Sequence, residues 1–391
     1  MDDTHNDSGL PLPDFYIENF RGIKKLTIPR LGRVTLLAGK NGVGKTTVLE
    51  AVEVFAERAR YTVLQDILLE RDEVSYALDE NREKYTFYNW DAIFYGRDIS
   101  SNVRTKLGPI QDRYQLILEP YSLLEVILEA EESFARWVAS LSFDSEPFVL
   151  RASFQGNDEI IPALLTSDKD YDVNASDPIA LEQELNYLAR RFNSRRPSSI
   201  KCERIGHGSL KNFQLPRLWG QVALTDDESQ VIQALKIAYG EEVDRVSVVS
   251  DEAASNAFGG QRAIVKLKGL AEPVPLKSLG GGATWLFGVA LALAYCKDGF
   301  LLIDEAENGV HHTVHRDYWR MLLETAYENN VQVFATTHSW DCVKSFAQAA
   351  ADFEDAEGVL VRLEKEDERM RAVRYSERRS KIAAEQGVEV R

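Results

Sequence analysis

Several features are scarce in this sequence of 391 residues, and each absence excludes a class of protein. The 3 cysteines, Cys202, Cys296 and Cys342, are odd in number and far apart, and they form no CxxC pair. This pattern argues against a disulfide framework and against a zinc site. The longest apolar run, 289–296, is far shorter than the ~20 residues that cross a membrane. No heptad pattern is sustained, so a long coiled coil is not expected.

Basic charge is also in short supply. The sequence has 46 Lys and Arg against 62 Asp and Glu, for a net charge of −16. This balance argues against wide coating of nucleic acid, but it leaves a local basic groove open, because charge acts over about 8–10 Å. The arginine pairs at 190–191 and 195–196 are the candidates for contact with DNA. The start is acidic and polar, unlike a signal peptide, so a cytoplasmic, reducing location is expected.

The sequence does contain a phosphate-binding loop. Residues 39–46 fit the pattern G-x-x-x-x-G-K-[ST] at every position, between an apolar strand at 33–38 and a helical pattern at 47–60. The loop residues are Gly39, Lys40, Asn41, Gly42, Val43, Gly44, Lys45 and Thr46. In such a loop the backbone amides and the helix N-terminus face phosphates. We expect Lys45 to reach the β- and γ-phosphates and Thr46 to bind Mg²⁺.

Two further strand ends carry candidate catalytic groups. Asp304 and Glu305 follow the apolar strand 300–303, which predicts a magnesium ligand and a base that activates water, respectively. His338 follows another buried strand, at 331–335, and is placed to sense the γ-phosphate. A lone histidine in such a position is more often an ordinary surface or core residue, and its distance after the acidic pair is what favours the functional interpretation.

A second glycine-rich turn opens an apolar helix at 280–296. Its residues are Ser278, Leu279, Gly280, Gly281 and Gly282. The turn lies too far along the chain to belong to the first loop, so it predicts a second anion site, one that caps a γ-phosphate held by another subunit. The alternative is a flexible turn with a serine N-cap.

These elements, in this order, resemble the motifs of ABC-type ATPases, and most closely those of the SMC, RecF and OLD branch. Residues 17–22 look like the I-x-N-F-R opening of that branch, and residues 335–339 match its A-T-T-H-S. Residues 304–312 resemble the D-E-x-E-N-G-L-H-P of OLD-like ATPases, with His312 where proline is common. Residues 92–97 are similar to an L-F-x-G-R element.

The resemblance implies an α/β fold: an ABC-type P-loop ATPase head, with a mixed β-sheet flanked by helices. Its core would comprise residues 14–60 and 226–391, interrupted by a mainly helical lobe at 61–225 and preceded by a polar tail at 1–13. The glutamine of the Q-loop, which relatives carry, is not assigned. Gln111 and Gln115 are the candidates.

The resemblance also implies a homodimer that buries two ATP molecules with Mg²⁺, with a larger oligomer left open. One subunit would supply Arg21, the P-loop with Thr47, the acidic pair and His338, and the other would supply Ser278 and the three glycines. OLD nucleases continue into a nuclease domain for which this sequence leaves no room. A separately encoded effector, such as a nuclease in anti-phage defence, is therefore the expected partner.

Two alternatives remain open at this point. One is a RecF-like ATPase of DNA repair or recombination, with DNA as its partner. The other is a scaffold that holds ATP and hardly hydrolyses it. A metal bound by His311 and His315, four residues apart, is a weaker hypothesis, because neither a cysteine nor a full set of acidic ligands lies nearby.

Overall fold

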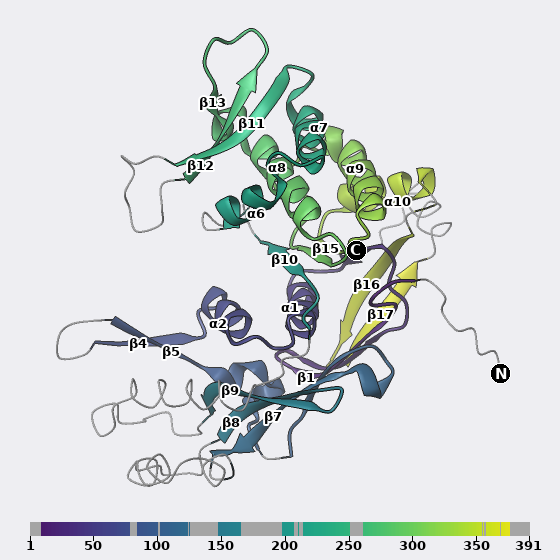
Figure 1. Ribbon diagram of the computed structural model, residues 1–391. Helices are drawn as coiled ribbons and strands as arrows, with labels where there is room; N and C mark the ends of the chain where they lie inside the picture. Colours follow the sequence, from purple (N-terminus) through teal and green to yellow (C-terminus); the bar gives the residue numbers. More distant parts are fainter. Residues whose placement is uncertain are drawn as a thin grey trace.

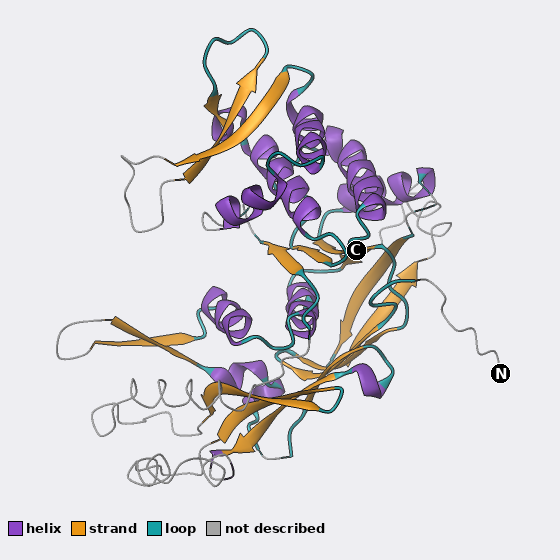
Figure 2. Cartoon of the chain, in the orientation of Figure 1, coloured by secondary structure: helices purple, strands orange, loops and turns teal. Residues whose placement is uncertain are grey.

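The computed structural model describes residues 9–78, 84–100, 102–123, 125, 148–165, 198–206, 210, 214–250, 261–353, 355, 357–367 and 369–375. These residues form layers, as Figure 1 shows: a group of helices, a mostly parallel sheet, helix α1 (Lys45–Ala56), and an antiparallel sheet. Helix α1 therefore lies between the two large sheets. Figure 2 shows most of the helices gathered on the side of the parallel sheet that faces away from α1.

The parallel sheet has the strand order β10-β14-β15-β3-β16-β17. Only its last strand runs antiparallel to its neighbour. The bounds are β3 (Val34–Ala38), β10 (Cys202–Ile205), β14 (Phe300–Ile303), β15 (Gln332–Thr337), β16 (Gly358–Glu366) and β17 (Arg369–Tyr375).

Hydrophobic cores cover both faces of this sheet. Along β14, Leu301 and Ile303 pack into the core beneath the helices, whereas Phe300 and Leu302 pack into the core around α1. Every residue of β3, β14 and β15 is buried. This is why β14 appears in the sequence as a continuous apolar run, and β3 nearly so, rather than as an alternating pattern.

The antiparallel sheet has the order β2-β1-β6-β7-β8-β9. Its strands are β1 (Phe15–Phe20), β2 (Ile23–Ile28), β6 (Thr105–Gly108), β7 (Leu116–Ser122), β8 (Phe148–Phe154) and β9 (Asn157–Leu165). Smaller sheets are formed by β4 (Val74–Leu78) with β5 (Lys84–Tyr88), and by β11 (Val243–Ser250), β12 (Gln261–Leu267) and β13 (Val274–Pro275).

The remaining helices are amphipathic or fully buried. Helix α8 (Gly281–Tyr295) is almost wholly apolar because it packs among other helices and against the parallel sheet. The others are α2 (Tyr61–Glu70), α6 (Gln214–Val222), α7 (Asp227–Tyr239), α9 (His315–Glu328) and α10 (Trp340–Asp352). None of the described helices is long and apolar enough to cross a membrane.

The predicted α/β fold with a mixed sheet and flanking helices is confirmed, and the described residues contain no long coiled coil. The expected helical lobe at 61–225 differs from what is observed. The described part of this stretch contains more strand than helix, and β6 to β9 extend the sheet that β1 and β2 begin. Residues 126–147 and 166–197, which include both arginine pairs, lie outside the described residues.

Candidate nucleotide site

The P-loop connects β3 to α1, and two of its glycines are required by geometry. Gly39 and Gly44 have φ angles of 153° and 102°. A Cβ on Gly39 would lie 2.8 Å from the carbonyl oxygen of Leu363, and one on Gly44 would lie 3.2 Å from the terminal carbon of Met370. The hairpin of β16 and β17 therefore packs directly against the loop and leaves room only for glycine.

The start of α1 is free to bind an anion. Its N-cap, Gly44, makes no side-chain capping bond, and its first turn has no acidic residue. The first backbone N–H groups of a helix lack partners within the helix, and the helix dipole places positive charge there. The first turn of α1 therefore offers backbone N–H groups and the positive end of the helix dipole to a phosphate.

The Lys45 side chain lies within the loop. Its ammonium donates to the carbonyl oxygens of Gly39 at 2.8 Å and Lys40 at 3.0 Å. Burial lowers the pKa of Lys45, while the carboxylates of Glu307, Asp304 and Glu305 act in the opposite direction. Three carboxylates therefore act on the Lys45 ammonium, which lies where the phosphates of a nucleotide would bind.

Thr46 and Asp304 meet as a metal site requires. The Thr46 hydroxyl donates to the two carboxylate oxygens of Asp304 at 3.0 and 3.2 Å. A hydroxyl beside a carboxylate is an all-oxygen donor set, and hard Mg²⁺ prefers such ligands. The residues therefore fit the metal that the sequence predicts. The assignment of these residues as metal ligands stays a prediction.

Thr336, near the end of β15, holds both acidic residues, and the sequence did not single it out. Its hydroxyl donates to Asp304 at 2.5 Å and accepts from the backbone N–H of Glu305 at 2.8 Å. In the parallel register Ile303 lies opposite Ala335, so Asp304 and Thr336 extend the same pairing by one residue. The signal in the sequence was only a threonine at a strand end.

Glu305 has an unusual backbone conformation. Its φ of 55° lies in the left-handed region, which costs an ordinary side chain roughly 1–2 kcal/mol. The side chain accepts from the amide of Asn308 at 2.6 Å. His338 Nδ1 lies 3.8 Å from one Glu305 oxygen and 3.0 Å from Glu307. The structure thus brings together the predicted base and the predicted sensor.

The glycine turn before α8 lies beside the loop that follows Asp304. Ser278 is in a 3₁₀ helix (Leu276–Leu279), and Gly280, with φ 98°, caps α8. A Cβ on Gly282 would lie 2.9 Å from the carbonyl oxygen of Gly309. The turn is therefore packed against the acidic loop of its own chain, and its predicted contact with a partner's nucleotide stays a prediction.

Arg21 lines a cavity of about 430 Å³ that also includes Thr47 of α1. Arg21 forms an ion pair with Glu50 at 3.3 Å, and burial lowers the pKa of the arginine. Its backbone N–H donates to Ile93, which places the 92–97 segment against the Arg21 turn. The opening motif at 17–22 and the 92–97 element therefore meet beside the first turn of α1. Arg71 and Arg97 also line this cavity.

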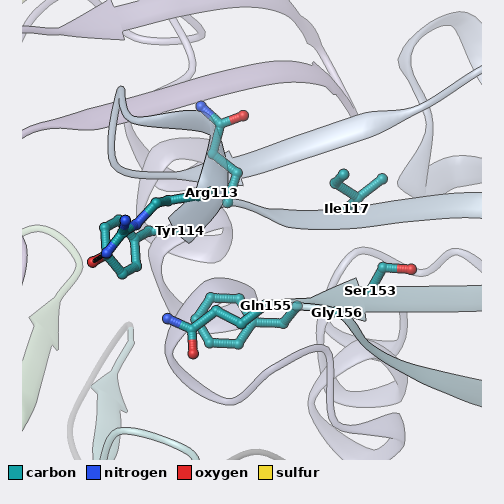
Figure 3. Close-up of a pocket in the computed structure, with 8 residues that line it drawn as sticks. Arg113, Tyr114, Ile117, Ser153, Gln155 and Gly156 are labelled. Atoms are coloured by element: carbon teal, nitrogen blue, oxygen red, sulfur yellow. Dashed lines mark hydrogen bonds between the residues drawn. The ribbon is translucent and has the colours of Figure 1, made fainter.

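Figure 3 shows a second cavity, at the start of β7 and the β8–β9 turn. Arg113 and Tyr114 lie on one side of it, and Gln155 and Gly156 on the other. Gln115, a candidate for the Q-loop, also lines it, and its amide donates to the carbonyl of Pro109 at 2.9 Å. The side chain of Gln115 is therefore hydrogen-bonded to the backbone just before β7.

The histidines after Asp304 do not form a metal site. His315 Nε2 lies 3.0 Å from the carbonyl oxygen of Val310, and His311 bonds to Thr313. Among the described residues, no group of three His, Cys, Asp or Glu side chains could hold a metal ion.

Comparison with known proteins gives a family match across both parts of the site. A model described as "AAA ATPase domain" matches residues 12–109 and 221–343, more than half of the chain. These ranges include the P-loop, the glycine turn, the acidic pair and His338.

Three curated relatives match shorter segments. Two are uncharacterized proteins of Methanocaldococcus jannaschii: one is 38% identical, covering 14% of this chain and 28% of the relative, and one is 37% identical, covering 21% and 71%. The DNA replication and repair protein RecF of Clostridioides difficile is 28% identical, covering 28% of this chain and 29% of RecF. The chain thus spans less than a third of two of these relatives.

Solved structures of SMC heads align loosely along the chain. The SMC head bound to the C-winged helix domain of ScpA has a TM-score of 0.45 at 11% identity, with 93% of this chain and 97% of the other covered. The SMC head domain from Thermotoga maritima has a TM-score of 0.39 at 15% identity, with 93% and 99% covered. The sequence match to the family model is the stronger of these findings.

Proposed function

Because this chain belongs to the family of AAA ATPase domains, we propose that it binds ATP with Mg²⁺ at its P-loop and hydrolyses it as a dimerising switch. The observation that carries the proposal is the contact of the Thr46 hydroxyl with both oxygens of Asp304, beside a buried Lys45. This contact joins the first turn of α1 to the end of β14, which is distant in sequence, and it assembles the donor set that a nucleotide and its metal need.

The chain's own residues would divide the work as follows. The P-loop amides and Lys45 bind the phosphates, while Arg21 and Thr47 line the adjoining cavity. Thr46 and Asp304 hold Mg²⁺, which when bound neutralises charge on the β- and γ-phosphates. Glu305 orients a water molecule toward the γ-phosphorus and takes its proton as the bond to ADP breaks, releasing ADP and phosphate. His338 contacts the γ-phosphate.

The second subunit would complete each site. A helix N-terminus with three glycines suits the γ-phosphate of a nucleotide held by a partner, and Ser278 adds a hydroxyl. Gly282 packs against Gly309 in the loop after Asp304. Movement of that loop on hydrolysis would therefore shift the glycine turn that contacts the partner subunit. ATP would thus tighten the dimer and hydrolysis would loosen it.

The wider role rests on resemblance to OLD-like ATPases. We propose an ATPase and sensor component of an anti-phage system that controls a separately encoded effector, such as a nuclease. The match to RecF favours the alternative of a DNA repair ATPase, for which DNA would stimulate turnover. A scaffold that holds ATP without hydrolysing it is the third candidate.

One experiment separates these candidates. Mass by light scattering and ATP turnover are measured for the wild type, Lys45→Ala and Glu305→Gln, with and without ATP–Mg²⁺ and duplex DNA. We expect Lys45→Ala to lose nucleotide binding, and Glu305→Gln to bind ATP, stay dimeric and lose about 10²–10⁴-fold in turnover. DNA-stimulated turnover would favour the repair role. A wild type without turnover, but with ATP binding, would favour the scaffold.

A further inference from the structure

We propose that Glu307 is a positioning residue that holds the His338 ring in one orientation and one tautomer for ATP hydrolysis. The inference rests on the proposed function, because His338 acts there on the γ-phosphate. Glu307 would thus be a third carboxylate of the site, beside Asp304 and Glu305. Its role would be to orient His338, not to bind metal or to take a proton.

The loop after β14 turns so that Glu307 points inward. Glu305 and Gly309 both have positive φ angles, 55° and 76°. Between them, the backbone N–H of Ala306 donates to the carbonyl of Thr336 at 2.9 Å, which fixes the loop against β15. The Glu307 side chain is only 10% exposed as a result, although it follows the strand by four residues and would otherwise be expected in solvent.

One oxygen of Glu307 contacts His338 twice. Oε1 accepts from the backbone N–H of His338 at 2.9 Å and lies 3.0 Å from its ring Nδ1. The nearest Glu305 oxygen is 3.8 Å from Nδ1, beyond hydrogen-bond reach. Because the same carboxylate binds both backbone and ring, it restrains the side-chain torsions of the histidine.

The other oxygen of Glu307 makes this arrangement costly. Oε2 is buried and has no hydrogen-bond partner among the described residues. An unsatisfied buried polar atom lowers the stability of the fold, and a charged one lowers it more. The carboxylate that acts most strongly on Lys45 is also Glu307, ahead of Asp304 and Glu305. A buried carboxylate retained at such cost beside the P-loop lysine and His338 is better explained by a task at the site than by stability.

The chemistry follows from the two ring nitrogens. A ring that donates from Nδ1 to a carboxylate keeps its proton there and presents Nε2 to the ligand. Without Glu307 the ring would be free to rotate and to exchange tautomers.

Turnover kinetics provide the first test. Glu307→Gln should lower kcat about 10–100-fold and leave KM for ATP within about twofold, because binding does not depend on the ring. His338→Ala should lower kcat similarly, and the double variant should lose no more than His338→Ala alone. Glu119→Gln, a buried carboxylate of the antiparallel sheet paired with Arg104 and Arg151, is the matched control and should keep wild-type kcat.

A second readout does not depend on turnover. ¹⁵N-labelled histidine spectra, with the His338 signal assigned by its loss in His338→Gln, should show a proton on Nδ1 in the wild type and a shift toward Nε2 in Glu307→Ala. Multiplicative losses in the double variant, or identical tautomers in wild type and Glu307→Ala, would overturn the inference. If the wild type did not hydrolyse ATP, the proposed function would fail, while the spectra would still decide whether Glu307 holds the ring.

Discussion

The two sheets that enclose α1 are assembled in opposite ways. In the antiparallel sheet most paired strands follow one another along the chain, as β1 with β2 and β6 through β9 do. In the parallel sheet, β3 pairs with β15 and β16, which come near the other end of the described chain. One sheet is built from local hairpins and the other from distant segments.

This difference determines where the candidate functional groups lie. The P-loop follows β3, Asp304 follows β14, and His338 follows β15, so the candidate groups meet at the carboxyl edge of the parallel strands. The antiparallel sheet contributes mainly a turn, with Arg21. Distant segments that meet at one edge can supply a metal ligand, a base and a phosphate loop together, whereas a hairpin sheet presents its polar groups one turn at a time.

Removing a buried leucine from each sheet would test this division most strongly. Leu302 of β14 and Leu118 of β7 are both fully buried in the core around α1. Each Leu→Ala change should lower the free energy of unfolding by about 2–5 kcal/mol, from lost contacts and the cavity left behind. Only Leu302→Ala should also weaken ADP–Mg²⁺ binding by calorimetry, because Asp304 lies two residues further on. Equal affinity losses in both variants would contradict the division.

Two buried threonines allow the two edges of the parallel sheet to be compared with each other. Thr336 and Thr35 are both fully buried in the parallel sheet, but Thr35 accepts from the backbone N–H of Gly32, at the opposite edge. Thr336→Val should lower kcat about 10–100-fold, because Asp304 and Glu305 lose their shared support. Thr35→Val should cost only stability, about 1 kcal/mol. Comparable kcat values for the two variants would show that the edge has no special role.

The smallest effect is expected at the helix between the sheets. Burial raises the pKa of Glu53 on α1 to about 7, although Arg204 of β10 donates to it at 2.6 Å. A carboxyl group with a folded pKa above its unfolded value favours the folded state below pH ~4.5, and this contribution is lost as the pH rises toward 7. We expect the free energy of unfolding to fall as the pH rises over that range.

Denaturant titrations at several pH values would measure this slope. Glu53→Gln should flatten it, whereas Glu324→Gln, an exposed carboxylate of α9, should leave it unchanged. A slope that persists in Glu53→Gln would assign the pH dependence to another group.

The parallel sheet and its loop were largely predictable from the sequence. Strands buried on both faces leave continuous apolar runs, and a P-loop leaves a fixed pattern of glycine, lysine and threonine, so both signals are local. Thr336 and Glu307 were not predicted as supporting residues. A threonine at a strand end and an acid in a loop look like solvated groups until the fold places Asp304 and His338 against them.

The antiparallel strands were harder to predict for a physical reason. β9 contains Pro162, which lacks an N–H for the ladder, and its register with β8 shifts between Val149 and Leu150. A proline inside a strand is tolerated at such an irregularity, on the edge of a sheet. The nine residues of β9 alone do not distinguish an edge strand with a proline from a loop. The four residues of β6 are too few to show a strand pattern.

The strand order has a consequence for how the protein is made. A ribosome adds about 5–20 residues each second, and domains fold as units as they emerge. The hairpins of the antiparallel sheet can pair early, but β3 waits for β15 and β16, about 15–60 s of further synthesis. During that interval the P-loop has no finished sheet beneath it and no Asp304 beside Thr46. The nascent chain therefore cannot assemble this site until β14, β15 and β16 have been synthesised, and nucleotide binding has to follow the pairing of these distant segments with β3.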